Sequence, residues 1–253
     1  MTPPPDSRWF RRYRTQGPPG VRLVVLPHAG GSAAFYHSWG GAFGPDTEVL
    51  VARYPGRQER LAEPCVEAME PLADQVTDAL LPFADVPLAL FGHSMGASLA
   101  HEVALRLEHR HRIRPACLHV SARSAPHRLT PGRARLETDE ELAAEVRRLG
   151  GTDTALLADP ELRELVLPAL RADFRVVAGY PPRPPVPVGC PVTAHTGDAD
   201  PAAPVADVEE WRRAAPAGFA LHVYPGGHFY LLDHHTRLVA DLTNALASAS
   251  QPL

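Results

Sequence analysis

Short apolar segments alternate along this chain with longer segments whose apolar residues recur at helical spacing, and this alternation constrains the fold more than any other feature. The apolar segments are nearly continuous, as in strands that are buried on both faces of a parallel sheet. The strand candidates are residues 21–27, 48–54, 87–92, 116–122, 191–196 and 220–224, and the helix candidates are residues 70–83, 95–109, 205–215 and 230–248. This order predicts a mostly parallel sheet flanked by helices on both faces, which is a three-layer α/β fold.

One stretch, from about residue 126 to residue 180, contains no convincing strand. Thr138 and Glu141 have the capping-box spacing at the start of one helix. Pro160 suits the first turn of a second helix, which Pro168 should kink or break. We therefore expect a single α/β domain over the whole chain of 253 residues, with a helical insert at about 126–180.

Composition excludes several classes of protein. The formal net charge is −4, whereas a nucleic-acid-binding domain usually carries a basic field. Cys65, Cys117 and Cys190 lie far apart without C-x-x-C spacing, which indicates neither a disulfide framework nor a zinc site. No apolar run approaches the roughly 18 residues of a membrane-spanning helix, and the first residues contain no signal-peptide core. We expect a cytoplasmic protein that holds no metal and binds neither nucleic acid nor membrane.

The pentapeptide Gly92-His93-Ser94-Met95-Gly96 has the pattern G-x-S-x-G and lies between a predicted strand and a predicted helix. This context resembles the nucleophile elbow of the α/β-hydrolase fold, a tight turn that exposes a serine hydroxyl at the carboxyl edge of the sheet. A glycine two residues away on each side avoids steric clash in such a turn. We therefore expect an α/β-hydrolase fold with Ser94 as the nucleophile.

The segment Pro27-His28-Ala29-Gly30-Gly31 ends the first predicted core strand. Acyl transfer requires backbone N–H groups directed at the oxyanion that develops in the transition state. In α/β-hydrolases one such group belongs to the residue after the nucleophile, and another comes from an early strand-to-helix loop of the H-G-G type. Met95 and Ala29 are therefore the predicted oxyanion-hole donors. The alternative is a plain glycine turn in which His28 is an ordinary polar residue.

Among the 13 histidines, His228 is the predicted general base. The order of the triad in this fold is serine, acid, histidine, and His228 follows the last predicted strand after a Pro-Gly-Gly turn. His222 lies inside that strand, and the histidines at 234–235 lie inside the final helix, so we expect core or surface roles for them. His93 lies within the elbow and is too constrained to reach back to the nucleophile.

Two carboxylates, Asp198 and Asp200, follow the predicted strand 191–196. The loop after strand 116–122 offers no acid, because no carboxylate occurs between Glu108 and Glu137. We assign Asp200 as the triad acid, since the loop tip should reach the histidine, and we expect Asp198 to shape the turn. Serine then attacks, histidine takes and returns the proton, and aspartate holds the imidazole tautomer. This chemistry needs no metal and no organic cofactor.

Several motifs together resemble the type II thioesterases of polyketide and nonribosomal peptide biosynthesis. They are HAGG at 28–31, YPGRQER at 54–60, GHSMGA at 92–97, GDADP at 197–201 and PGGHFYL at 225–231. The aromatic pair Trp9-Phe10 and the segment LPALRADFRVVAGY at 167–180 are similar to that family as well. The resemblance extends from Trp9 to the last helix, and the HAGG, YPGRQ and PGGHF motifs are its most specific part.

The resemblance implies a stand-alone editing enzyme that hydrolyses short or aberrant acyl chains from the phosphopantetheine arm of acyl carrier protein domains. Ser94, Asp200 and His228 would be its triad, Ala29 and Met95 its oxyanion donors, and residues 126–180 a mobile helical lid. YPGRQ favours a polyketide synthase as the partner, and we expect a monomer. Basic residues cluster near the start of the insert, and they would form either a carrier-docking patch or a solvated loop: Arg123, Arg128, Arg133 and Arg135.

Three other functions remain open on the sequence. A small-molecule esterase or lipase would have the same fold and triad. A chain-terminating thioesterase that cyclises its product is usually fused to a synthase. A non-catalytic hydrolase-fold binding protein is expected to have lost a triad member, whereas serine, aspartate and histidine are all in place here.

Overall fold

The computed structural model describes residues 8–130, 138–150 and 160–249. Its centre is a seven-stranded sheet with the order β1-β3-β2-β4-β5-β6-β7. β1 pairs with β3 in antiparallel fashion, and the other neighbouring strands are parallel. The strands are β1 (Phe10–Tyr13), β2 (Val21–Leu26), β3 (Thr47–Ala52), β4 (Leu88–His93), β5 (Cys117–Ser121), β6 (Val192–Gly197) and β7 (Phe219–Tyr224). The predicted α/β architecture with a mostly parallel sheet is confirmed.

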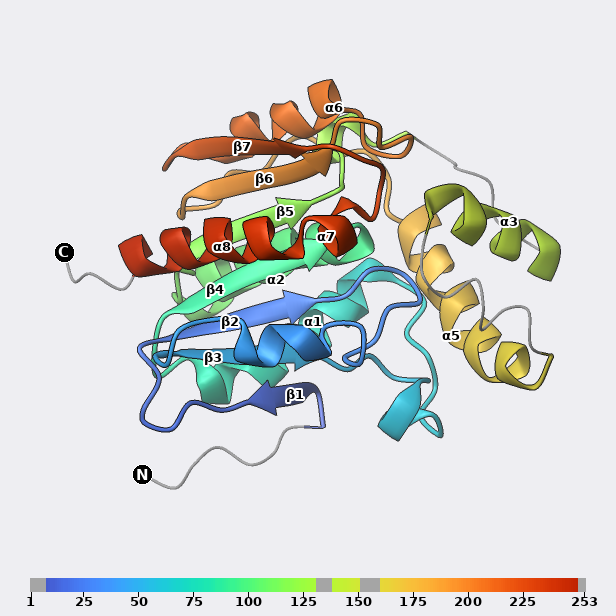
Figure 1. Ribbon diagram of the computed structural model, residues 1–253, viewed down its shortest axis with the longest axis horizontal. Helices are drawn as coiled ribbons and strands as arrows, with labels where there is room; N and C mark the ends of the chain where they lie inside the picture. Colours follow the sequence, from blue (N-terminus) through green and yellow to red (C-terminus); the bar gives the residue numbers. More distant parts are fainter. Residues whose placement is uncertain (1–7, 131–137, 151–159, 250–253) are drawn as a thin grey trace.

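Helices cover both faces of this sheet (Figure 1). One face packs against α1 (Met69–Leu80), α2 (Met95–His111) and α6 (Val205–Glu209), and the other against α8 (His235–Ala249). Alternate residues of a strand serve the two cores, as Leu23 and Val24 of β2 do. The remaining short elements are the α-helix α7 (Tyr230–Asp233) and the 3₁₀ helices η1 (His37–Gly41), η2 (Gln58–Arg60), η3 (Leu81–Phe83), η4 (Pro126–Arg128) and η5 (Glu210–Ala214).

Three predicted helices are each divided in the structure. The segment 70–83 forms α1 and then continues as the 3₁₀ helix η3. The segment 205–215 forms α6 and then continues as the 3₁₀ helix η5, and the segment 230–248 is interrupted at His234 between α7 and α8. His234 has φ −110° and ψ 25°, which lies outside the α-helical region. Periodicity predicted the apolar faces here but could not detect these local changes of backbone geometry.

The sequence pattern does not predict β1, which forms one edge of the sheet. Its sequence is FRRY, and only Phe10 is buried. The strand exists because its backbone pairs with β3, with Phe10 opposite Ala52 and Tyr13 opposite Val49. A short, charged edge strand carries little apolar periodicity, so propensity alone does not reveal it.

In the described part of residues 126–180 the chain forms the α-helices α3 (Asp139–Leu149) and α5 (Pro160–Ala178), besides the short η4. Thr138 and Glu141 form the predicted capping box. The two helices pack through a small apolar cluster of their own, which includes Leu142 and Leu170. They lie beyond the carboxyl ends of the parallel strands (Figure 1). α5 continues through Pro168, so the predicted break is absent.

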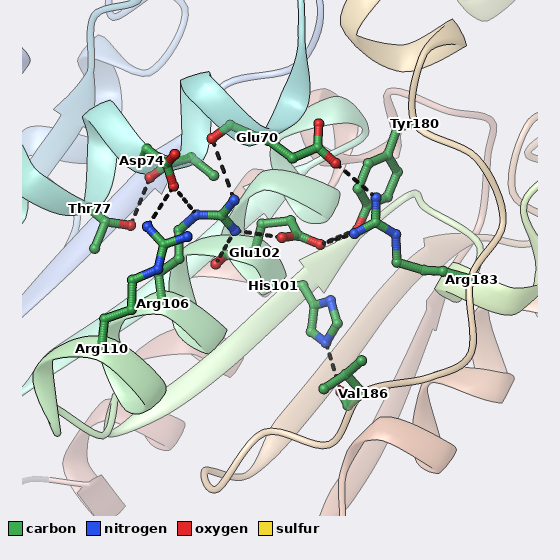
Figure 2. Close-up of polar contacts among 11 residues, drawn as sticks. Glu70, Asp74, Thr77, His101, Glu102, Arg106, Arg110, Tyr180, Arg183 and Val186 are labelled. Atoms are coloured by element: carbon green, nitrogen blue, oxygen red, sulfur yellow. Dashed lines mark hydrogen bonds and ion pairs between the residues drawn. The ribbon is translucent and has the colours of Figure 1, made fainter.

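A buried polar network holds the chain just after α5 against α1 and α2 (Figure 2). Its centre is Glu102 of α2, whose Oε1 accepts hydrogen bonds from Tyr180 Oη at 2.7 Å and Arg183 Nη1 at 2.9 Å. Its Oε2 accepts from Arg106, which also bonds Asp74 of α1. The end of the insert is therefore attached to the two helices that support the sheet.

Candidate active site

The turn between β4 and α2 has the strained geometry expected of an elbow. Ser94 has φ 56° and ψ −116°, and its N–H donates to the Ser121 carbonyl at 2.8 Å. A Cβ added to Gly92 would lie 1.9 Å from the Gly96 carbonyl oxygen, and one added to Gly96 would lie 2.0 Å from the Leu26 carbonyl oxygen. Both contacts are with backbone that cannot yield, so the turn requires glycine at both positions.

Ser94, His228 and Asp200 come from three separate connections and form a continuous chain of hydrogen bonds. His228 Nε2 lies 2.9 Å from Ser94 Oγ, and His228 Nδ1 lies 2.8 Å from Asp200 Oδ2. The histidine follows β7, and the aspartate follows β6. Both side chains are buried. Parallel strands end at the same edge of the sheet, which is why residues so far apart in sequence meet here.

Asp198 lies in the same loop as Asp200 but does not reach the histidine. It is exposed, and its Oδ1 accepts a hydrogen bond from the Gly226 N–H at 2.9 Å. The two loops approach so closely that a Cβ on Gly197 would lie 2.3 Å from the Gly226 carbonyl oxygen. Asp198 therefore ties the loop after β6 to the loop after β7, and this contact brings His228 within reach of Asp200.

Ala29 and Met95, the predicted oxyanion donors, lie in two turns at the same edge of the sheet. Met95 is the first residue of α2, directly after the elbow serine. The loop 28–31 is closed by a hydrogen bond from the Gly31 N–H to the His28 carbonyl at 2.9 Å. Since C=O and N–H point in opposite directions across a trans peptide, this bond directs the Ala29 N–H away from the interior of the turn.

The other candidate histidines have structural surroundings. His93 Nδ1 lies 2.8 Å from Ser121 Oγ, and burial, together with the neighbouring His228 and His28, holds its pKa well below the usual value. His28 packs edge-to-face against Phe35 and Phe229. Its pKa is lowered to about 3, mainly by burial and further by the charges of His228 and Arg57. Both side chains are therefore neutral near pH 7.

His222 lies 3.2 Å from Asp241, His234 directly follows α7, and His235 begins α8.

Two of the basic residues near the start of the insert form contacts with other side chains. Arg123 donates to Ser98 at 2.9 Å, and Arg128 pairs with Asp207 at 2.8 Å. Arg133 and Arg135 lie outside the described residues.

A cavity of about 1070 Å³ adjoins Ser94 and His228. On the insert side α3 contributes the charged Glu145 and Arg148, and α5 contributes an apolar wall: Leu165, Val166, Ala169, Leu170, Phe174 and Val177. An acyl chain fits such a space, with its carbonyl carbon at the serine hydroxyl. Among the described residues no group of three His, Cys, Asp or Glu side chains could hold a metal ion, and no helix in the described ranges could cross a membrane.

Two residues at this site have no role in the sequence-based prediction. Arg57 and Asp173 form a buried ion pair between the loop after β3 and α5, with two short contacts of 2.6 and 2.7 Å. Asp173 also accepts a hydrogen bond from the Gly30 N–H at 2.8 Å. The motifs YPGRQER and LPALRADFRVVAGY contain these residues, but nothing in either motif indicates that the two side chains meet.

A family profile described as "Thioesterase domain" matches residues 21–246. Thioesterase PikA5 of Streptomyces venezuelae is 47% identical over 240 residues, covering 94% of this chain and 85% of that protein. The structure of the type II thioesterase BorB, from the borrelidin biosynthetic cluster, is 43% identical with a TM-score of 0.86 and covers 94% of this chain and 97% of its own. RedJ, a thioesterase of the prodiginine pathway in Streptomyces coelicolor, is 39% identical with a TM-score of 0.82, at 90% and 88% coverage.

Proposed function

The chain belongs to the thioesterase family, and we propose that it hydrolyses acyl thioesters on carrier proteins through an acyl-enzyme at Ser94. It is a type II thioesterase of the kind found in polyketide and nonribosomal peptide clusters, and a hydrolase. The observation that carries the proposal is the chain of hydrogen bonds from Asp200 through His228 to Ser94, beside a cavity that α5 lines with apolar side chains. An acyl chain would be desolvated against the apolar side chains that α5 contributes to that cavity.

In the first half-reaction Ser94 Oγ attacks the thioester carbonyl carbon while His228 Nε2 accepts the hydroxyl proton. The C–S bond then breaks, and the proton passes from His228 to the departing phosphopantetheine thiolate. In the second half-reaction water attacks the acyl-serine, His228 accepts a proton from that water and returns it to Ser94 Oγ, and the carboxylic acid leaves. The N–H groups of Ala29 and Met95 stabilise both tetrahedral oxyanions, and Asp200 holds the histidine with its proton on Nδ1.

The natural substrates in this proposal are short or aberrant acyl groups on carrier domains of a biosynthetic assembly line, with a polyketide synthase as the favoured partner. A thioester is already activated, so broad recognition by apolar contacts is sufficient for hydrolysis. Residues 126–180 act as the lid of a single domain, since α5 supplies the outer wall of the cavity. Closing such a lid excludes water from the acyl group until the acyl-enzyme has formed.

Intact-protein mass spectrometry with short acyl-carrier thioesters tests the proposal. The wild-type protein should gain the acyl mass transiently, and Ser94→Ala should not gain it at all. Ser38→Ala, which removes an exposed hydroxyl on η1, is the control and should behave like the wild type. Acylation of Ser94→Ala would refute the assignment. Faster turnover of p-nitrophenyl esters than of carrier thioesters would favour an esterase, and no reaction with a fluorophosphonate would favour a non-catalytic binding protein.

A further inference from the structure

Asp173 of α5 is only 2% exposed, and its carboxylate oxygens bond to two loops far from it in sequence. Its Oδ2 accepts hydrogen bonds from the Gly30 N–H at 2.8 Å and from Arg57 Nη1 at 2.6 Å. Its Oδ1 accepts from Arg57 Nη2 at 2.7 Å. A buried ion pair repays its desolvation only when the geometry is good and further hydrogen bonds are satisfied, and this pair meets both conditions.

The loop that receives these contacts is the one that holds the Ala29 N–H. The peptide group between Ala29 and Gly30 is held in place because its N–H, that of Gly30, donates to Asp173. The next residue is fixed through its carbonyl, because Arg57 Nη1 donates to Gly31 O at 3.2 Å. Gly30 has φ +76°, and a Cβ there would lie 2.6 Å from Leu170 of α5. Hydrogen bonds from Asp173 and Arg57 therefore fix two successive residues of this loop from outside, and Leu170 leaves no room for a side chain at position 30.

We propose that Asp173 and Arg57 are positioning residues that orient the Ala29 N–H toward the oxyanion. This inference rests on the proposed function, because it requires that Ala29 serves the oxyanion hole. Its consequence is a coupling between the insert and the chemistry. Since Asp173 is carried by α5, the oxyanion loop is held in place only while α5 is docked over the cavity, so substrate enclosure and transition-state stabilisation occur together.

The network around Glu102 offers a matched control (Figure 2). Glu102 is also a buried carboxylate near the end of the insert, but it lies on α2, and its side chain bonds to Arg106, Tyr180 and Arg183 rather than to the loop 28–31. In Glu102→Gln each arginine keeps another carboxylate, since Arg106 pairs with Asp74 and Arg183 with Glu70. The variant therefore removes a buried, arginine-bound carboxylate while α5 stays docked and the loop 28–31 is untouched, because the amide oxygen can still accept from Tyr180 and Arg183.

The test measures hydrolysis of a short acyl thioester of N-acetylcysteamine and inhibition by an alkyl trifluoromethyl ketone, whose adduct with serine places an oxyanion in the hole. Asp173→Asn should lower kcat about ten- to hundredfold, below the roughly 10²–10³-fold cost of removing an oxyanion donor itself. KM should change less than about twofold, and the inhibition constant of the ketone should rise by the same factor as kcat falls, because both report the transition state. Glu102→Gln should change neither quantity.

The double variant Arg57→Met with Asp173→Leu separates positioning from stability and decides the matter if Asp173→Asn does not fold. Replacing a buried ion pair by apolar side chains of similar size is often neutral or stabilising, so thermal stability should recover while kcat and ketone inhibition stay impaired. Recovery of kcat with stability would overturn the inference, and so would equal effects of Asp173→Asn and Glu102→Gln. If instead the ketone fails to inhibit the wild type, or inhibits Ser94→Ala equally, the proposed function itself is wrong.

Discussion

Asp200→Asn is a sharp test of the proposed triad, because Asp200 uses both of its carboxylate oxygens. Oδ1 accepts hydrogen bonds from the N–H groups of Ala202 at 2.7 Å and Ala203 at 3.2 Å. Oδ2 faces His228 Nδ1 at 2.8 Å. An asparagine here must keep its carbonyl oxygen on the two backbone donors, so its NH₂ group must face the histidine.

The consequence follows from the tautomer of the imidazole. When the asparagine NH₂ group donates to His228 Nδ1, that nitrogen must act as an acceptor, so the imidazole proton lies on Nε2. His228 Nε2 then donates to Ser94 Oγ and cannot accept the hydroxyl proton. The same substitution in another serine triad lowers kcat about 10⁴-fold, which corresponds to about 5.4 kcal/mol of activation free energy. We expect a loss of that order here.

The assay is steady-state hydrolysis of a short acyl thioester, with thermal melts to establish folding. Asparagine retains the volume and the two backbone hydrogen bonds of Asp200, so the loss of charge should cost about 1 kcal/mol of unfolding free energy and about 2–4 °C in Tm.

Asp198→Asn is the matched control, because an amide oxygen can still accept from the Gly226 N–H. It should stay within a fewfold of the wild-type kcat. The reasoning is refuted if Asp198→Asn is the crippled variant, or if Asp200→Asn is folded and loses less than about tenfold.

Three further predictions concern the turn, the pH and the insert. Gly96→Ala should yield misfolded protein by circular dichroism, because its Cβ would lie 2.0 Å from the Leu26 carbonyl oxygen; a soluble, active variant would contradict this. Burial holds the pKa of His28 and of His119 at about 3, so below pH 6.5 the unfolded state binds more protons than the folded state. Each of these histidines should therefore lower the unfolding free energy by about 1 kcal/mol between pH 7 and pH 5.5. Urea titrations at the two pH values should show a lower unfolding free energy at pH 5.5, to which the buried His93, His101 and His195 contribute in the same direction, and a stability that rises on acidification would contradict this. If residues 126–180 gate the cavity, the amides of α3 should exchange hydrogen faster than those of β4, and equal protection would argue against gating.

Much of the fold follows from local patterns in the sequence. The six parallel strands, β2 to β7, and the elbow all depend on rules that act within a few residues. Near-continuous apolar runs of this length are typical of strands buried on both faces, and G-x-S-x-G between strand and helix allows few backbone conformations. The positions of Ser94 and His228 at strand ends were predictable for the same reason.

Tertiary structure alone decided the rest. β1 exists because β3 offers its backbone groups, and α5 continues through Pro168, which local rules oppose. The sequence placed two aspartates after β6, but only loop packing separates Asp200, which meets His228, from Asp198, which ties two turns together. Arg57 and Asp173 are 116 residues apart. No local pattern can indicate that such residues meet, because their contact depends on where the insert docks, and docking is a property of the whole fold.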